Sequence, residues 1–154
     1  MADSLRQDIM DVLGASLETI STANGYETNV GLKTYEWRAY AFDDSQLPIL
    51  TYRDTDDIIV VTHNYAMHQL RVEMFFAAAG DTSPNRARDV IADINSMIVS
   101  QKDAGKDTYF DELVLDIVPI ESPLDAEQAD KKLLGCTVAY NFFFLTPKLS
   151  SFLT

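Results

Sequence analysis

Few residues of this sequence combine the types and the spacing that enzyme chemistry or metal binding needs. The histidines, His63 and His68, do not form a His-x-x-x-His pair of the kind that begins a zinc site. His68 alternates with Leu70 and Val72 in a strand pattern, so we interpret it as a histidine of the core or of an interface. Cys136 stands among apolar residues and is interpreted as an inert packed thiol.

The acidic group Asp54, Asp56 and Asp57 could hold a hard cation, but the glycine and the distal glutamate of an EF-hand loop do not follow it. We therefore expect no metal site. The sequence also lacks a nucleophile-elbow serine, a phosphate loop and the dinucleotide-binding glycine pattern. We expect no cofactor and no enzymatic activity, although a catalytic set assembled from distant residues would leave no motif.

Composition indicates one globular domain over residues 1–154, because 47% of the residues are hydrophobic and 10% are aromatic. No apolar run approaches the roughly 20 residues of a membrane span, and the first residues do not read as a signal peptide. A single cysteine cannot form an internal disulfide, which suits a reducing cytosol. We expect a protein that is made inside a cell and does not enter a membrane.

The charge balance excludes one class of partner. With 24 acidic and 12 basic residues the net charge is −12, which argues against binding of nucleic-acid phosphates. Seven acidic residues and no basic one lie between Asp111 and Asp130. Two interpretations stay open: solvated loops that keep the protein soluble, or an acidic surface that repels nucleic acid or lines a passage.

Two helices are expected. The first runs from Ser4 to Asn24, with Ser4 and Gln7 as a capping box and Gly25 as its stop. The second opens at Ser83-Pro84 and ends near Lys102.

The strand pattern then sets the fold class. Strands are expected around Tyr35 to Arg38 and over Ile49 to Arg53, Ile58 to Val61, His68 to Ala79, Glu112 to Ile120 and Cys136 to Leu145. The order predicts an α+β fold, in which two helices pack on one face of a mixed, mainly antiparallel sheet. The expected core contains Leu13, Leu17, Val72, Met74, Ile91, Ile94, Leu115 and Val138.

The last strand is apolar on both faces, which is typical of a strand that is covered on both sides. One small domain has little to cover the second face, so we expect a partner chain. The candidate interface residues lie on this strand and on His68 to Ala79: Arg71, Glu73, Phe75, Asn141, Phe143 and Leu145. A mixture of aromatic residues and arginine is typical of interface centres.

A series of short segments follows in a distinctive order: Ser4 to Ile9, Ile20 to Tyr26, Val30-Gly31, Tyr35 to Arg38, Leu47 to Leu50, Arg53 to Asp57, His68 to Glu73, Ala77 to Gly80, Glu127 to Lys132 and Gly135 to Val138. In order and spacing they resemble the small tail terminator proteins (tail completion or minor tail proteins) of long-tailed phages and prophages. The resemblance covers nearly the full chain.

The resemblance implies a structural virion protein of the phage tail, assembled in the host cytoplasm. In that family a ring of subunits, six in the expected case, caps the tail tube, stops its polymerisation and offers a surface for head–tail joining. Its partners would be further copies of itself, the tail tube protein and a head–tail connector protein, while DNA passes through the lumen without specific binding.

The acidic segment has a place in this expectation. We expect Asp54, Asp56 and Asp57 to form the turn of a hairpin that projects from the body and reaches a neighbouring subunit or the tube. The alternative for the whole chain is a small monomeric α+β enzyme or ligand-binding module with a pocket between helices and sheet. Oligomeric state separates the two hypotheses.

Overall fold

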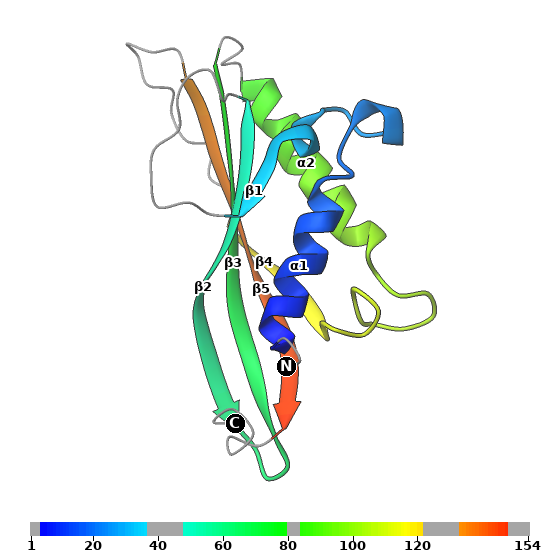
Figure 1. The fold of residues 1–154 in the computed structure, drawn as a ribbon, viewed down its shortest axis with the longest axis vertical. Coiled ribbons are helices and arrows are strands. Elements are labelled where there is room, and N and C mark those ends of the chain that lie inside the picture. Colours follow the sequence, from blue (N-terminus) through cyan, green and yellow to red (C-terminus); the bar gives the residue numbers. More distant parts are fainter. Residues whose placement is uncertain (1–3, 37–47, 80–83, 122–132, 148–154) are drawn as a thin grey trace.

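The computed structural model describes residues 4–36, 48–79, 84–121 and 133–147, and Figure 1 shows their arrangement. They form two α-helices and a five-stranded sheet, which is mixed and mainly antiparallel, so the predicted α+β class is confirmed. Several predicted features lie outside the described residues: Trp37-Arg38, the Ser83 cap, and residues 122–132, which include much of the acidic stretch.

The first helix, α1, spans Leu5–Leu17 and is shorter than predicted. Its predicted cap is present, because the Ser4 hydroxyl accepts a hydrogen bond of 3.1 Å from the backbone N–H of Gln7. Past Leu17 the chain leaves the helix, and the Thr19 hydroxyl donates to the carbonyl of Ser16. A short 3₁₀ turn, η1 (Thr22–Asn24), follows.

Two glycines shape the segment after α1. Gly25 ends η1 at a φ of +89°, in the left-handed region that glycine accepts without strain. Gly31 lies in a second 3₁₀ turn, η2 (Val30–Lys33), where a β-carbon would collide with the backbone oxygens of Leu17 and Ile20. The chain can therefore return closely against the end of α1 only with glycine at position 31.

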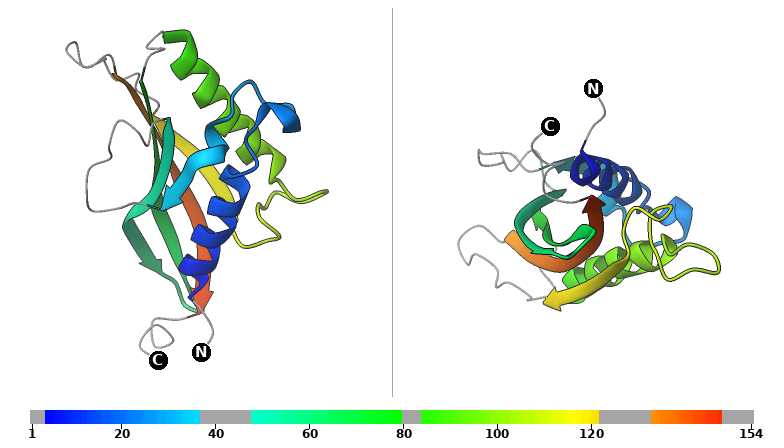
Figure 2. Two further views of the ribbon diagram at one scale, coloured as in Figure 1. Left: turned by 45° about the horizontal axis from the view of Figure 1, so that its top comes forward. Right: turned by 90° about the horizontal axis from the view of Figure 1, so that it is seen from below.

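The sheet has the strand order β1-β2-β3-β5-β4. Its strands are β1 (Thr34–Glu36), β2 (Ile49–Val61), β3 (Tyr65–Ala79), β4 (Asp116–Glu121) and β5 (Leu133–Pro147). β1 pairs in parallel with β2, and every other pair is antiparallel. The sheet is strongly curved rather than flat, as Figure 2 shows.

The predicted hairpin turn at Asp54 to Asp57 is wrong. β2 continues through these residues, and the chain reverses only at residues 62–64, where the N–H of Thr62 donates to the carbonyl of Tyr65. The acidic residues instead occupy a bulge, because Asp54 and Asp57 pair with Val72 and Leu70, one residue more on β2 than on β3. The β2–β3 hairpin is thus longer than expected, and it extends past the start of α1 (Figure 1).

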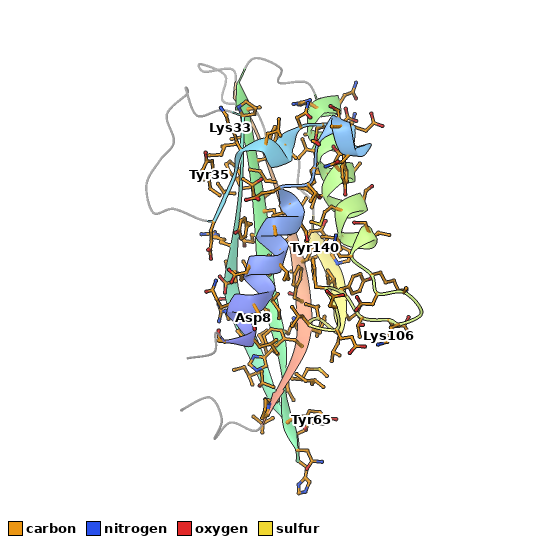
Figure 3. The ribbon with its side chains drawn as sticks, turned by 45° about the vertical axis from the view of Figure 1, so that its right-hand side comes forward. Asp8, Lys33, Tyr35, Tyr65, Lys106 and Tyr140 are labelled. Carbon is orange, nitrogen blue, oxygen red and sulfur yellow. The ribbon has the colours of Figure 1, made fainter. Side chains whose placement is uncertain are left out.

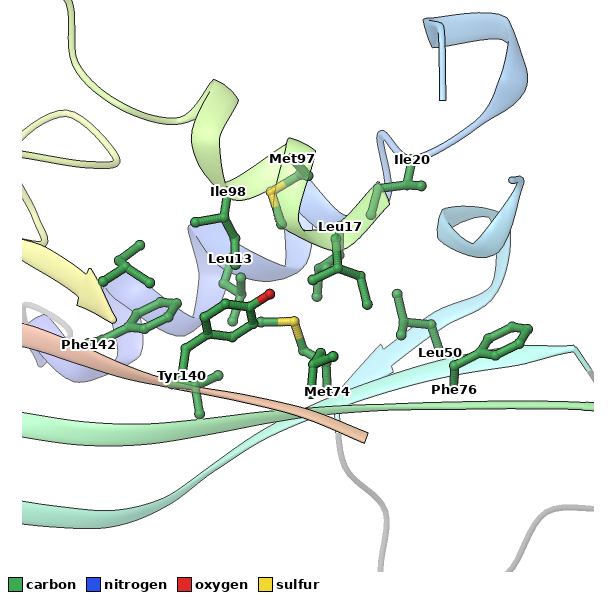
Figure 4. Packing of buried hydrophobic residues seen from close by; sticks show 14 of the residues in the cluster. Leu13, Leu17, Ile20, Leu50, Met74, Phe76, Met97, Ile98, Tyr140 and Phe142 are labelled. Carbon is green, nitrogen blue, oxygen red and sulfur yellow. The ribbon is translucent and has the colours of Figure 1, made fainter. Parts of the chain in front are cut away.

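The phases predicted for the strands that became β3 and β5 are confirmed. The alternating residues Leu70, Val72, Met74 and Phe76 of β3 are fully or almost fully buried, and so are Val138, Tyr140, Phe142 and Phe144 of β5. Figure 4 shows Leu13 and Leu17 of α1 and Met97 and Ile98 of the second helix, α2 (Pro84–Ser100), beside Met74 and Tyr140. Of the eight core residues expected, Ile91 and Leu115 are only partly buried.

Both helices make side-chain contacts with this buried face of the sheet. The Tyr140 hydroxyl donates to Asn95 of α2, and Arg6 of α1 pairs with Asp54. Tyr140 and Asp54 each lie opposite Val72 in the ladder, so they project from the same face as Val72. These contacts support the expectation that both helices pack on one face, which stays a prediction.

The predicted strand Glu112 to Ile120 begins later than expected. Phe110, Asp111 and Glu112 have positive φ angles of 54°, 55° and 68°, a left-handed backbone that cannot continue a strand. The Asp103 carboxylate stabilises this loop, since it accepts hydrogen bonds from the N–H groups of Asp111 and Glu112 at 3.0 and 2.8 Å. β4 consequently starts at Asp116.

Candidate assembly surface

The six candidate interface residues lie together on one face of the sheet, opposite the core-facing side chains. In the register of β3 and β5, Arg71 lies opposite Asn141, Met67 opposite Leu145 and Gln69 opposite Phe143. We call these six residues the sheet patch: Arg71, Glu73, Phe75, Asn141, Phe143 and Leu145. Phe75 keeps 37% of its surface exposed, while Phe143 and Leu145 are half-buried.

A charged row crosses the sheet patch. It consists of Arg53, Glu73 and Arg71: Arg53 donates twice to one Glu73 oxygen, at 3.1 and 2.9 Å, and Arg71 donates to the other at 3.0 Å. Partial burial acts to raise the pKa of Glu73, but the hydrogen bonds and charges of the two arginines outweigh it and lower the pKa. Sequence reasoning did not place Arg53 in the interface, although it belongs to this row.

Beyond the charged row the β2–β3 hairpin becomes apolar. We call residues Ile58 to Met67 the apolar arm. Large apolar side chains along it are exposed: Ile58, Ile59, Val60, Val61, Tyr65 and Met67. Figure 3 labels Tyr65 close to the end of the hairpin, far from the buried Tyr140. The arm continues the sheet patch, because Val60, Met67 and Leu145 lie side by side on three adjacent strands.

The sequence does contain a signal for the apolar arm that the strand pattern alone did not expose. From residue 58 to residue 70 there is no Asp, Glu, Lys or Arg, in a chain of which 23% is charged. Depletion of charged residues is typical of interface cores. This charge-free run, of which residues 58–65 are exposed, therefore makes the apolar arm a candidate contact surface.

The three acidic residues of the expected turn have different surroundings. Asp54 pairs with Arg6 of α1, and Asp57 lies 2.8 Å from the Nδ1 atom of His68. Both carboxylates are mostly covered, with 24% and 14% of their side chains exposed. Asp56 is exposed. The bulge explains the division, because it turns Asp54 and Asp57 to the core-facing side.

His68 is a buried link between three strands. Its Nδ1 atom lies 2.8 Å from Asp57 of β2, and its Nε2 atom lies 2.8 Å from the hydroxyl of Thr146 of β5. The ring stacks on Phe144 at 4.5 Å between centroids, and only 3% of the residue is exposed. The sequence left open whether this histidine belongs to the core or to an interface, and its burial places it in the core.

Two open depressions occur among the described residues. One, of about 360 Å³, is lined by Glu18, Gly31, Leu32, Lys33, Thr34 and Tyr35. The other, of about 270 Å³, is lined by Asp103, Ala104, Lys106, Asp111 and Glu112. Within the part of the chain that the structure describes, no group of three or more His, Cys, Asp or Glu side chains could hold a metal ion. Cys136 is buried, in keeping with a packed thiol.

Comparison with known proteins adds no family to this geometry. Neither a protein-family model nor a curated protein matches the sequence. No helix of the described residues is long and apolar enough to cross a membrane. The sheet patch and the apolar arm are therefore the features on which a functional interpretation depends.

Proposed function

We propose that this chain is a structural subunit of a ring that caps the tail tube of a long-tailed phage or prophage. The ring ends polymerisation of the tube protein and offers the surface to which the head–tail connector binds. The resemblance of the sequence to tail terminator proteins supplies the biological role. The sheet patch supplies the physical support, because a ring needs subunit surfaces that become buried on assembly.

The observation that carries the proposal is the composition of the sheet patch. It combines Phe75, Phe143 and Leu145 with the charged row, in which Glu73 is held by two arginines. Aromatic and arginine side chains are enriched at the centres of protein interfaces. The pre-formed charged row also fixes both guanidinium groups, which lowers the entropy that binding must remove.

The charge of the chain suits a ring that DNA passes through. At a net charge of −12 per subunit, the lumen repels phosphate rather than binding it. Asp56, which is exposed on β2, is the member of the acidic segment that is free to face a lumen or a partner.

The experiment is a double substitution in the sheet patch, Phe143→Ser with Leu145→Ser. We expect the wild-type chain to form a ring by multi-angle light scattering and to halt growth of purified tail tubes. The double variant should stay folded by circular dichroism but lose the ring. As a matched control, Leu32→Ser with Val99→Ser removes two other exposed apolar side chains, 71% and 69% exposed, and should leave assembly intact.

A wild-type monomer that has no effect on tube length would refute the proposal. Equal loss of assembly in the test and control variants would refute the role of the sheet patch. A monomer that binds a small molecule near the depressions would favour the ligand-binding alternative.

A further inference from the structure

The end of β2 is apolar and exposed on both of its sides. Ile58 and Val60 share the face of the sheet patch, and their exposed fractions are 56% and 60%. Ile59 and Val61 project from the opposite face, with 42% and 53% exposed. Four consecutive β-branched residues in this state expose apolar surface that a partner can cover on both sides.

The backbone edge of the same segment is also uncovered within the described residues. β1 pairs with β2 only at Leu50, Thr51 and Tyr52, so past Tyr52 no described strand pairs with the outer edge of β2. Exposed apolar edge strands are association sites unless charge or proline blocks them. The segment 58–61 has neither.

The absence of charge on the apolar arm suits a second copy of this chain as its occupant. Two copies that each carry −12 repel one another, and contact between acidic surfaces adds to that cost. A basic partner would be recognised through acidic residues, and the apolar arm contains none. Because the arm carries no charged residue, two acidic chains can meet there without bringing carboxylates close together.

The opposite edge of the sheet offers a matching surface on β4. Val118 and Ile120 are 41% and 39% exposed, and they stand on either side of Pro119. Proline has no backbone N–H, so β4 is poorly suited to add a fully hydrogen-bonded strand. Contact through side chains is therefore favoured. Asp116 and Glu121 bound this uncharged stretch in sequence, so an acidic arm would be repelled there and a charge-free one is not.

We infer that the apolar arm of one copy packs against Val118 and Ile120 on β4 of the next copy. The two surfaces lie toward opposite edges of one sheet in the order β1-β2-β3-β5-β4, so the contact is head-to-tail. A head-to-tail contact repeats from copy to copy and closes into a ring when the rotation allows. This inference rests on the proposed ring and adds the arm-to-β4 contact to the sheet patch as a surface that joins its subunits.

Cysteine pairing tests the contact directly. The double variant Val60→Cys with Val118→Cys places one thiol on each surface, while the native Cys136 is buried and does not compete. Treatment with a short bis-maleimide should yield a ladder of covalent multimers that ends at the size of the ring. Each single variant should yield no species beyond a dimer.

The control moves the second thiol to another exposed apolar site. Val60→Cys with Leu32→Cys uses a residue that is 71% exposed and lies just before β1, the strand next to β2 in the sheet. It should not give a ladder. A ladder of equal length from this control, or none from Val60→Cys with Val118→Cys while light scattering shows oligomers, would overturn the inference and leave the proposed ring standing.

The remaining outcomes separate the two proposals further. A ladder from a protein that does not affect tube length would support the contact and refute the proposed role in tail termination. A monomer at every concentration, with no ladder, would overturn both.

Discussion

Replacement of Asp57 by alanine is the sharpest test of the buried cluster on β2. The substitution removes the carboxylate that lies 2.8 Å from Nδ1 of His68. His68 is 3% exposed, so water cannot readily replace the lost acceptor. In the neutral imidazole with its proton on Nδ1, the Nδ1–H group donates to Asp57 and Nε2 accepts from Thr146. Alanine at position 57 leaves that N–H donor without its carboxylate acceptor.

The expected magnitude follows mainly from two opposing terms, since the 3.9 Å pair of Asp57 with the partly exposed Arg6 adds little. Leaving a buried donor without its acceptor costs about 1–3 kcal/mol. Against this, the other carboxylate oxygen of Asp57, Oδ1, is buried and has no hydrogen-bond partner among the described residues, so its removal relieves a desolvation cost. We therefore expect a net loss of about 1–2 kcal/mol in the free energy of unfolding, which is the lower part of the range of about 1–3 kcal/mol for an unpaired donor.

Urea unfolding followed by circular dichroism measures the effect. With a slope of about 2 kcal/mol per M, the midpoint should fall by about 0.5–1 M. Asp56→Ala is the matched control, since it lies one residue away on the same strand and is exposed, and its effect should stay within about 0.5 kcal/mol. Asp57→Asn keeps an acceptor and should fall between the two. Equal midpoints for Asp57→Ala and Asp56→Ala would refute the reasoning.

Three further predictions concern the core, the charged row and a buried carboxylate. Leu17→Ala, at a fully buried site, should cost about 2–5 kcal/mol in urea unfolding, and a cost below 1 kcal/mol would contradict the packing of α1. The lowered pKa of Glu73 stabilises the fold above the pKa of the unfolded state, near 4.5, and this contribution is lost as the pH falls through the folded pKa. Exchanging both arginines of the charged row for methionine should flatten the stability profile as the pH falls below about 4.5, and an unchanged profile would show that the row does not stabilise the fold. Asp93 is buried in α2 and accepts hydrogen bonds from the N–H groups of residues 27 and 28 at 3.0 and 2.8 Å. Asp93→Ala should therefore cost about 2–4 kcal/mol by the same assay, whereas a loss within 0.5 kcal/mol would show that this anchor is dispensable.

Local pattern was enough to predict the class of fold and most of its core. Apolar spacing places Leu13 and Leu17 on one helical stripe, and alternation places Val72 and Met74 on one strand face; all four are buried. These predictions hold because burial requires an apolar face of the right period, and that period is a property of neighbouring residues. The same alternation brought the sheet patch onto one face, since β3 and β5 pair without a register shift.

Where partners distant in sequence decide the backbone, the pattern failed. Asp54 to Asp57 reads as a turn because acidic residues disfavour strands. In the fold, Arg6 pairs with Asp54 from 48 residues away and His68 pairs with Asp57 from 11 residues away, and these partners stabilise the acidic side chains within the strand. Likewise, Asp103 holds residues 110–112 in a left-handed loop that no alternation could reveal. Each case depends on a side chain whose position is unknown until the chain has folded.

The sequence by itself determined the acidity of this protein, its helical and strand periods, the charge-free run from residue 58 to 70, and a resemblance that suggests a role. Only the tertiary structure decided that residues 58–65 of this run form the exposed end of a hairpin and that Val118 and Ile120 lie toward the opposite edge of the same sheet. It also decided that two of the three acidic residues are mostly covered and paired with Arg6 and His68. The physical reason is that composition and period depend on residues near each other in the chain, whereas edges, bulges and ion pairs depend on which strands become neighbours.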